Sequence, residues 1–160
     1  MAIRNPSQLK ALLKPGQRLL GLDFGDRRIG LALSDPSLTI ASALSTIERQ
    51  SMVKDVAALI RSLRDNEAGG MIVGLPLQMD GTEGERAEIT RKFTTSLLQR
   101  VDIEIAFWDE RLSSAAVERM LIAEADMSRK RRQEVIDKTS AAYILQGALD
   151  AMAYRANAPL

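Results

Sequence analysis

Acidic residues follow two apolar segments of the sequence at the point where each segment ends. Asp23 comes directly after the run 19–22, and Asp109 and Glu110 come after the alternating segment 102–108. Open α/β sheets bind ligands at strand ends, and because strand side chains alternate, we expect only one of Asp109 and Glu110 to face Asp23. The alternatives are a turn role for Asp23 and a helix-dipole role for the two later acids.

A third acid, Asp137, lies on the otherwise apolar face expected of a long C-terminal helix. Its helical stripe continues through Ala141, Ile144 and Ala148. A charge on such a face needs a partner or a cation. In the alternative interpretation, Asp137 is the N-cap of a helix that starts at Lys138.

The residue types at these three positions predict metal-dependent chemistry on a phosphodiester. The sequence contains no Cys and no His, which excludes thiol nucleophiles, thiolate zinc sites and the usual general base. Clustered carboxylates suit Mg²⁺ or Mn²⁺, because these ions prefer oxygen ligands. Two such ions about 4 Å apart can activate a water and stabilise the leaving oxygen of a phosphodiester.

Basic residues near the three acidic positions in the sequence fit an anionic substrate, since Lys and Arg bind phosphate backbones. They are Arg27, Arg28, Arg111, Arg129, Lys130, Arg131, Arg132 and Lys138. The run 129–132 is also typical of a solvated charge run or a loop. The net charge of +1 does not itself indicate nucleic acid, because phosphate binding needs a local cluster.

The elements that must position these residues follow from hydrophobic periodicity and turn signals. Strands are expected at 18–23, 29–34, 43–47, 71–74 and 102–108, with the first two forming a hairpin. Helices are expected at 5–13, from Ser51 to a stop at Gly69 and Gly70, from Glu83 behind the capping pair Thr82 and Glu85, after Ser113, and over 132–152. This order predicts one α/β domain with helices on both sheet faces.

Length and composition indicate a single soluble domain. The chain has 160 residues, of which 46% are hydrophobic and 27% charged, and no apolar run approaches the roughly 20 residues of a membrane span. No N-terminal segment is typical of a secretory signal, so we expect a cytoplasmic protein. We expect an N-terminal extension with a short helix at 1–17, the folded domain at 18–155 and a tail at 156–160.

Four ordered blocks resemble the YqgF family, Holliday-junction-resolvase-like proteins regarded as nucleases for the 5′ end of pre-16S ribosomal RNA. The blocks are LGLDFGDRRIGLALSD, GLPLQMDGTEGERA, DERLSS and RKRRQEVIDKTSAAYILQ. The resemblance implies an RNase H-like fold, a mixed five-stranded sheet led by an antiparallel three-stranded meander and flanked by helices. It also implies that Asp23, Glu110 and Asp137 are the catalytic, metal-binding acids, which selects Glu110 over Asp109.

The function implied by this resemblance is a nuclease that uses Mg²⁺ or Mn²⁺ and processes pre-16S rRNA in ribosome biogenesis. The expected partner is a nucleic acid, either precursor rRNA or branched DNA. No membrane partner is expected, and the sequence leaves open whether the protein forms a homodimer. The alternatives are a DNA junction nuclease, a nucleotide-binding protein and a non-catalytic RNA-binding assembly factor. The chain lacks a Walker pattern, and carboxylates repel phosphate unless a metal intervenes.

Overall fold

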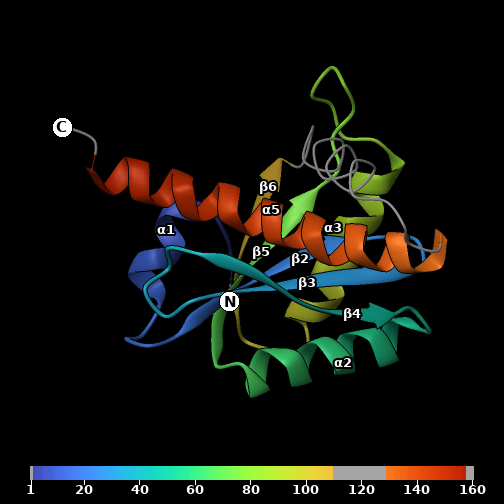
Figure 1. The fold of residues 1–160 in the computed structure, drawn as a ribbon, viewed down its shortest axis with the longest axis horizontal. Coiled ribbons are helices and arrows are strands. Elements are labelled where there is room, and N and C mark those ends of the chain that lie inside the picture. The colour runs from blue at the N-terminus through green and yellow to red at the C-terminus, as the bar shows by residue number, and fades with distance from the viewer. Residues whose placement is uncertain (1, 110–128, 158–160) are drawn as a thin grey trace.

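A central six-stranded sheet organises the molecule (Figure 1). The computed structural model describes residues 2–109 and 129–157, with side chains from 5 to 109 and from 139 to 153. The strands are β1 (Ala2–Arg4), β2 (Arg18–Phe24), β3 (Arg28–Ser34), β4 (Ala41–Glu48), β5 (Ala68–Leu75) and β6 (Glu104–Asp109). Their spatial order is β1-β6-β5-β2-β3-β4, so β2 and β5 lie in the centre.

The sheet is antiparallel on one side and parallel on the other. β2, β3 and β4 form an antiparallel meander, whereas β5 runs parallel to β2 and β6 runs parallel to β5. This arrangement confirms the expected mixed α/β fold with its leading meander. The N-terminal segment adds one strand that was not predicted, because β1 has only three residues and pairs parallel to β6.

Helices cover both faces of the sheet. They are α1 (Pro6–Leu12), α2 (Met52–Asp65), α3 (Glu85–Leu98) and α5 (Arg129–Asn157). Apolar residues of α2 and α3 share one core cluster with Leu20 and Leu22 of β2, and those of α1 and α5 share the other with Leu19. This division follows from the alternation of side chains along β2. Among the described helices, none is both long and apolar enough to cross a membrane.

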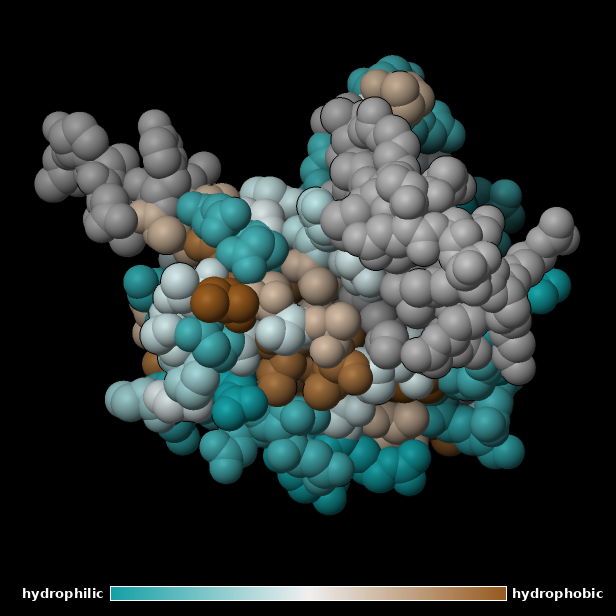
Figure 2. Space-filling view, viewed as in Figure 1, coloured by the Kyte–Doolittle hydropathy of each residue, from teal (hydrophilic) through white to brown (hydrophobic). Residues whose placement is uncertain are grey.

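Strand β4 closes one edge of the sheet and carries a partly apolar surface. All its residues are half-buried or exposed, and Ile40 just before it is 60% exposed. Figure 2 shows hydrophobic residues gathered along this strand, with hydrophilic residues dominating the surface of α2 below it. Single exposed apolar side chains of this kind are normal in soluble proteins.

The start of α2 confirms its sequence signal, but its end does not. The Ser51 hydroxyl accepts a hydrogen bond from the Lys54 amide at 3.2 Å, as an N-cap should. The helix then ends at Asp65, and Gly69 and Gly70 lie inside β5, so the prediction that these glycines stop the helix is wrong. A Cβ on Gly70 would lie 2.9 Å from the end of the Leu19 side chain, so this glycine lies in close contact with β2.

The start of α3 also differs from its prediction. The helix begins at Glu85 behind Gly84, and the expected capping pair of Thr82 and Glu85 does not form. Instead, the Thr82 amide and hydroxyl both donate to the Asp80 carboxylate, at 3.0 and 2.6 Å. Local hydrogen bonds of this kind compete with helix capping, and here they stabilise the loop before the helix.

Helix α5 resolves the alternatives for the C-terminal segment. It begins at Arg129, so Asp137 lies well inside the helix and its N-cap interpretation is wrong. The basic run 129–132 forms the first turn of α5 rather than a loop. The expected helix after Ser113 lies outside the described residues.

Candidate active site at the carboxyl edge of the sheet

Asp23 lies at the carboxyl end of β2, on the sheet face that α5 covers. Its neighbours Leu22 and Phe24 pack into the core beneath α2 and α3, so alternation turns Asp23 to the opposite face, with Leu19. Asp23 pairs with Gly30 of β3 and its side chain is half-buried. The structure therefore places this carboxylate in a central strand, one residue before the strand ends.

A tight turn follows Asp23, and its two arginine side chains differ in their exposure to solvent. The Gly25 amide donates to the Arg28 carbonyl at 2.9 Å, and a Cβ on Gly25 would lie 2.7 Å from that oxygen, so only glycine fits. Arg27 is exposed at this turn. Arg28 is only 9% exposed, and its Nε atom donates to Glu48 at 2.9 Å. This contact gives Arg28 a structural role in joining β3 to β4.

Arg49 holds the same turn in place, and its part in the site was missed in the sequence. Its Nη1 atom donates to the carbonyl oxygens of Gly25 and Asp26, each at 3.1 Å. Its guanidinium carbon lies 4.4 Å from the centroid of the Phe24 ring, and its Nε lies 3.9 Å from Oδ2 of the buried Asp55. The only local signal is an arginine after a strand, which does not reveal these contacts.

The strand register brings β6 to the same edge of the sheet. Leu22 pairs with Val73 of β5, which pairs with Phe107, and the next pair is Gly74 with Trp108. One residue further along β2 is Asp23, so Asp23, Gly74 and Trp108 form one row across three parallel strands. Trp108 is partly buried and packs against the core cluster beneath α5, which places it on the same face as Asp23.

The same register separates the two acids at the end of β6. Asp109 follows Trp108 directly, and alternation therefore turns Asp109 to the face opposite Asp23. Asp109 is exposed and pairs with Leu75. Glu110 and Arg111 lie outside the described residues.

Helix α5 brings Asp137 toward the same end of β2. A Cβ on Gly21 would lie 2.7 Å from Leu145 Cβ and 3.0 Å from the Ala141 carbonyl, so β2 and α5 are in close contact there. Asp23 is two strand residues beyond Gly21, about 6.6 Å, and Asp137 is four helix residues before Ala141, about 6 Å. Figure 1 shows the N-terminal part of α5 at the end of the sheet where β2 turns into β3. The backbone therefore directs both positions to one edge.

The loop between β5 and α3 stands at this edge and is held by its own hydrogen bonds. Leu77 and Glu83 form an isolated β-bridge, and the Gln78 amide donates to the Thr82 carbonyl at 2.8 Å. Arg91 of α3 pairs with Glu83, and this hydrogen bond lowers the pKa of the Glu83 carboxyl. Figure 1 shows the loop protruding beyond the end of β5.

The described residues contain only part of the predicted metal site. Within that part of the chain, no three acidic side chains are grouped to hold a metal ion. Asp23 is described, whereas Glu110 and the side chain of Asp137 are not. The side chains of further predicted contacts also lie outside the described residues, namely Arg129, Lys130, Arg131, Arg132 and Lys138. The half-buried carboxylate of Asp23 is an oxygen donor that suits a hard divalent cation.

Comparisons with known proteins support the sequence resemblance. A family model described as "RuvX: Holliday junction resolvase" matches residues 17–151. A protein of Rhodospirillum centenum named "Putative pre-16S rRNA nuclease" is 56% identical over 155 residues, which cover 94% of this chain and 82% of the relative. A protein of the same name from Paramagnetospirillum magneticum is 52% identical over 150 residues, covering 94% and 96%.

A solved structure shows the same fold. The structure titled "T. thermophilus RuvC in complex with Holliday junction substrate" aligns with a TM-score of 0.55 at 13% identity, covering 86% of this chain and 96% of that one. A second structure, titled "Thermus thermophilus RuvC structure", aligns with a TM-score of 0.53. The expected RNase H-like architecture is thus confirmed at the level of the fold.

Proposed function

Because the chain belongs to the RuvX family of Holliday junction resolvases, we propose that it is a nuclease that hydrolyses phosphodiester bonds in pre-16S rRNA. The substrate follows the shared name of relatives that are 56% and 52% identical over most of the chain. The resemblance drawn from the four sequence blocks is thereby confirmed as a family relationship. We also propose that the substrate of this chain is RNA rather than DNA.

The observation that carries the proposal is the meeting of three elements at one edge of the sheet. Asp23 lies one residue before the end of β2 on the α5 face, and Trp108 lies one residue before the end of β6 in the same row. Helix α5 approaches Gly21 so closely that a Cβ there would clash. Residues separated by more than 100 positions in the sequence thus come to one place. This edge is also where α/β sheets bind their ligands.

We propose that Asp23, Glu110 and Asp137 hold Mg²⁺ or Mn²⁺ there. The ion would supply an activated water and charge stabilisation for the leaving oxygen. Alternation along β6 supports Glu110, because Asp109 is turned to the opposite face.

The basic side chains at this edge would bind and orient the substrate strand. Arg27 is exposed at the turn that follows Asp23, and the run 129–132 forms the first turn of α5. These positions, with Arg111 and Lys138, stay predicted phosphate contacts. Arg28, also a predicted phosphate contact, is buried in the structure and pairs with Glu48.

The test is a cleavage assay with purified protein and either Mg²⁺ or Mn²⁺. The substrates are a precursor rRNA with its 5′ extension and a branched DNA of similar length, with the product ends mapped. We expect cleavage of the RNA and at least a ~100-fold loss in Asp23→Asn, because removal of one charge-stabilising group costs about that much. Asp65→Asn, at the exposed end of α2, is the matched control.

The outcomes distinguish the alternative functions. Cleavage of branched DNA alone would favour a DNA nuclease, and absence of cleavage on both substrates with both metals would contradict the proposal. Normal growth of cells that carry only the Asp23→Asn protein, together with normal RNA binding, would favour a non-catalytic assembly factor. Thermal unfolding of each variant shows whether a loss of activity is a loss of fold.

A further inference from the structure

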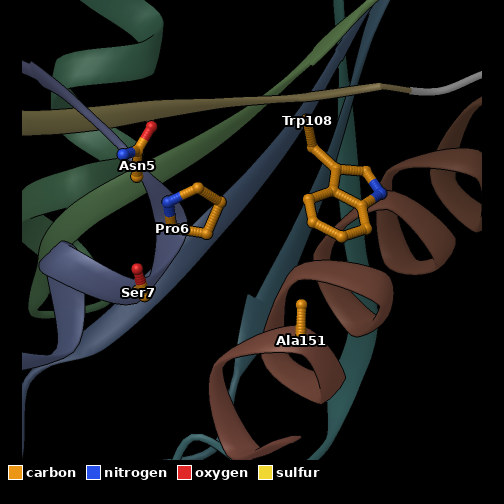
Figure 3. A pocket seen from close by; sticks show the side chains of 5 residues that line it. All are labelled: Asn5, Pro6, Ser7, Trp108 and Ala151. Carbon is orange, nitrogen blue, oxygen red and sulfur yellow. The ribbon is translucent and has the colours of Figure 1, made fainter. Parts of the chain in front are cut away.

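A cavity of about 180 Å³ lies between the start of α1, the end of β6 and the C-terminal half of α5. Among the residues whose side chains the structure describes, its lining comprises Asn5, Pro6, Ser7, Trp108 and Ala151. Figure 3 shows the pyrrolidine ring of Pro6 and the indole of Trp108 on opposite sides of the cavity, with the Ala151 methyl group pointing between them. The cavity thus has two ring-bearing walls and a small residue at its base.

The N-terminal segment forms one wall of this cavity. Arg4 of β1 pairs with Ala106 of β6, so Pro6, two residues further along, comes level with Trp108. On the other side, a Cβ on Gly147 would lie only 3.0 Å from the indole Nε1, and glycine therefore lets α5 approach the tryptophan. The family match begins at residue 17, so Asn5, Pro6 and Ser7 lie outside it.

The lining residues that the structure describes favour a small, planar group. Trp108 and Pro6 offer flat apolar surfaces, whereas Asn5 and Ser7 bring an amide and a hydroxyl that can donate and accept hydrogen bonds. The volume is well below the ~300–1,000 Å³ of pockets for drug-sized ligands, so it suits one ring system.

The position of the cavity relates it to the candidate active site. Trp108 belongs to the row that also contains Gly74 and Asp23, and it lies on the same face of the sheet. Two strand spacings of ~4.8 Å separate the Trp108 and Asp23 backbones by about 10 Å. Gly74, between them, carries no side chain on this face. A strand bound at Asp23 could therefore place a neighbouring nucleotide at Trp108.

We propose that this cavity binds one unpaired nucleobase of the substrate strand, a few nucleotides from the bond that is cleaved. The inference rests on the proposed nuclease function and adds a subsite to it. Trp108 stacks on the base, and Asn5 and Ser7 hydrogen-bond to its edge. Single-stranded RNA is commonly recognised in this way, by aromatic stacking and by hydrogen bonds to the base edges.

The test uses the fluorescence of Trp108, the only tryptophan in the sequence. The probe is a short single-stranded RNA of mixed sequence, titrated in EDTA so that it is not cleaved. Ala151→Leu fills the cavity from α5, and Ala153→Leu makes the same change at an exposed position of that helix. We expect saturable quenching in the wild type and in Ala153→Leu, and its loss in Ala151→Leu with about 5-fold or greater weakening of binding.

A second variant protects the test against a folding defect. Ser7→Ala removes a lining hydroxyl at a half-buried position and keeps Asn5, the N-cap of α1, so it should weaken binding while quenching persists at saturation. Fully double-stranded RNA of the same sequence should quench much less, because its bases are not free to enter the cavity. Circular dichroism establishes that each variant is folded.

The results separate this inference from the proposed function. Equal binding and quenching by wild type and Ala151→Leu, or no quenching of the wild type, would overturn the cavity inference. If the wild type nevertheless cleaves RNA, the nuclease function stands without this subsite. If RNA quenches Trp108 as expected but no cleavage occurs with either metal, the cavity stands and the nuclease function fails.

Discussion

The Nη1 atom of Arg49 lies 3.1 Å from the carbonyl oxygen of Gly25, in the turn that follows Asp23. The same atom binds the Asp26 carbonyl, and the Arg49 amide donates to the Arg27 carbonyl at 2.9 Å. One residue beyond β4 thus contacts three successive residues of the β2–β3 turn. The turn carries a proposed phosphate contact and continues the strand that carries a proposed metal ligand, so Arg49 positions both.

Substitution of Arg49 should destabilise this end of the fold. In Arg49→Ala the turn loses two hydrogen bonds and Asp55, only 4% exposed, loses its nearby cation, so we expect the free energy of unfolding to fall by about 2 kcal/mol or more. The free energy of unfolding of Arg49→Lys should lie between those of the wild type and Arg49→Ala, because lysine keeps the charge but lacks the planar guanidinium group. Urea denaturation measures the change. The control Arg64→Ala, in the exposed last turn of α2, should stay within about 0.5 kcal/mol, and an equal effect in both would contradict the role of Arg49.

A methyl group at Gly21 should separate β2 from α5. The added Cβ would lie 2.7 Å from Leu145 Cβ and 3.0 Å from the Ala141 carbonyl, so we expect Gly21→Ala to lower the free energy of unfolding by about 1–3 kcal/mol. The cleavage rate should fall even under conditions where Gly21→Ala is fully folded, because α5 also carries Asp137. The measurements are urea denaturation and cleavage rate at a temperature where the variant is folded. Wild-type stability would show that α5 does not pack on Gly21 as described.

The stability of the β3–β4 connection should depend on pH through Asp35. Hydrogen bonds from the Ile40 amide, the Ser37 hydroxyl and the Thr39 amide lower its pKa from 3.8 to about 2. A lowered folded-state pKa means that this stabilisation is present above the unfolded-state value of 3.8 and is lost as the pH falls toward 2. Thermal unfolding should therefore show a gap between wild type and Asp35→Asn that is constant near pH 6 and shrinks below pH 4. A difference in unfolding temperature that grows as the pH falls would contradict this role of Asp35.

The two acids at the end of β6 should respond differently to neutralisation. Asp109 is turned to the face opposite Asp23, so Asp109→Asn should keep cleavage within a few-fold of the wild type. Glu110→Gln should lose cleavage about as strongly as Asp23→Asn. The assay is the metal-dependent RNA cleavage described above, with thermal unfolding as the check on folding. If Asp109→Asn lost cleavage and Glu110→Gln kept it, Asp109 rather than Glu110 would be the metal ligand.

Local patterns in the sequence determined most of the elements. The apolar runs around 18–24 and 28–34, with a short glycine-containing segment between them, predicted the hairpin because such patterns act over a few residues. Ser51 predicted the start of α2 for the same reason, since a cap is a contact between near neighbours. The sequence also pointed to Asp23 and Asp137, each of which interrupts an apolar pattern.

Only the tertiary structure decided features that depend on contacts between distant segments. Gly69 and Gly70 resemble a helix stop, yet they lie inside β5, where the end of the Leu19 side chain packs against Gly70. Arg49 gains its role from a turn more than 20 residues away. The row of Asp23, Gly74 and Trp108 exists because parallel strands share a register, and the N-terminal residues meet Trp108 because β1 pairs with β6. Periodicity within a segment cannot specify which segments lie side by side, and that choice assembles both the site and its neighbouring cavity.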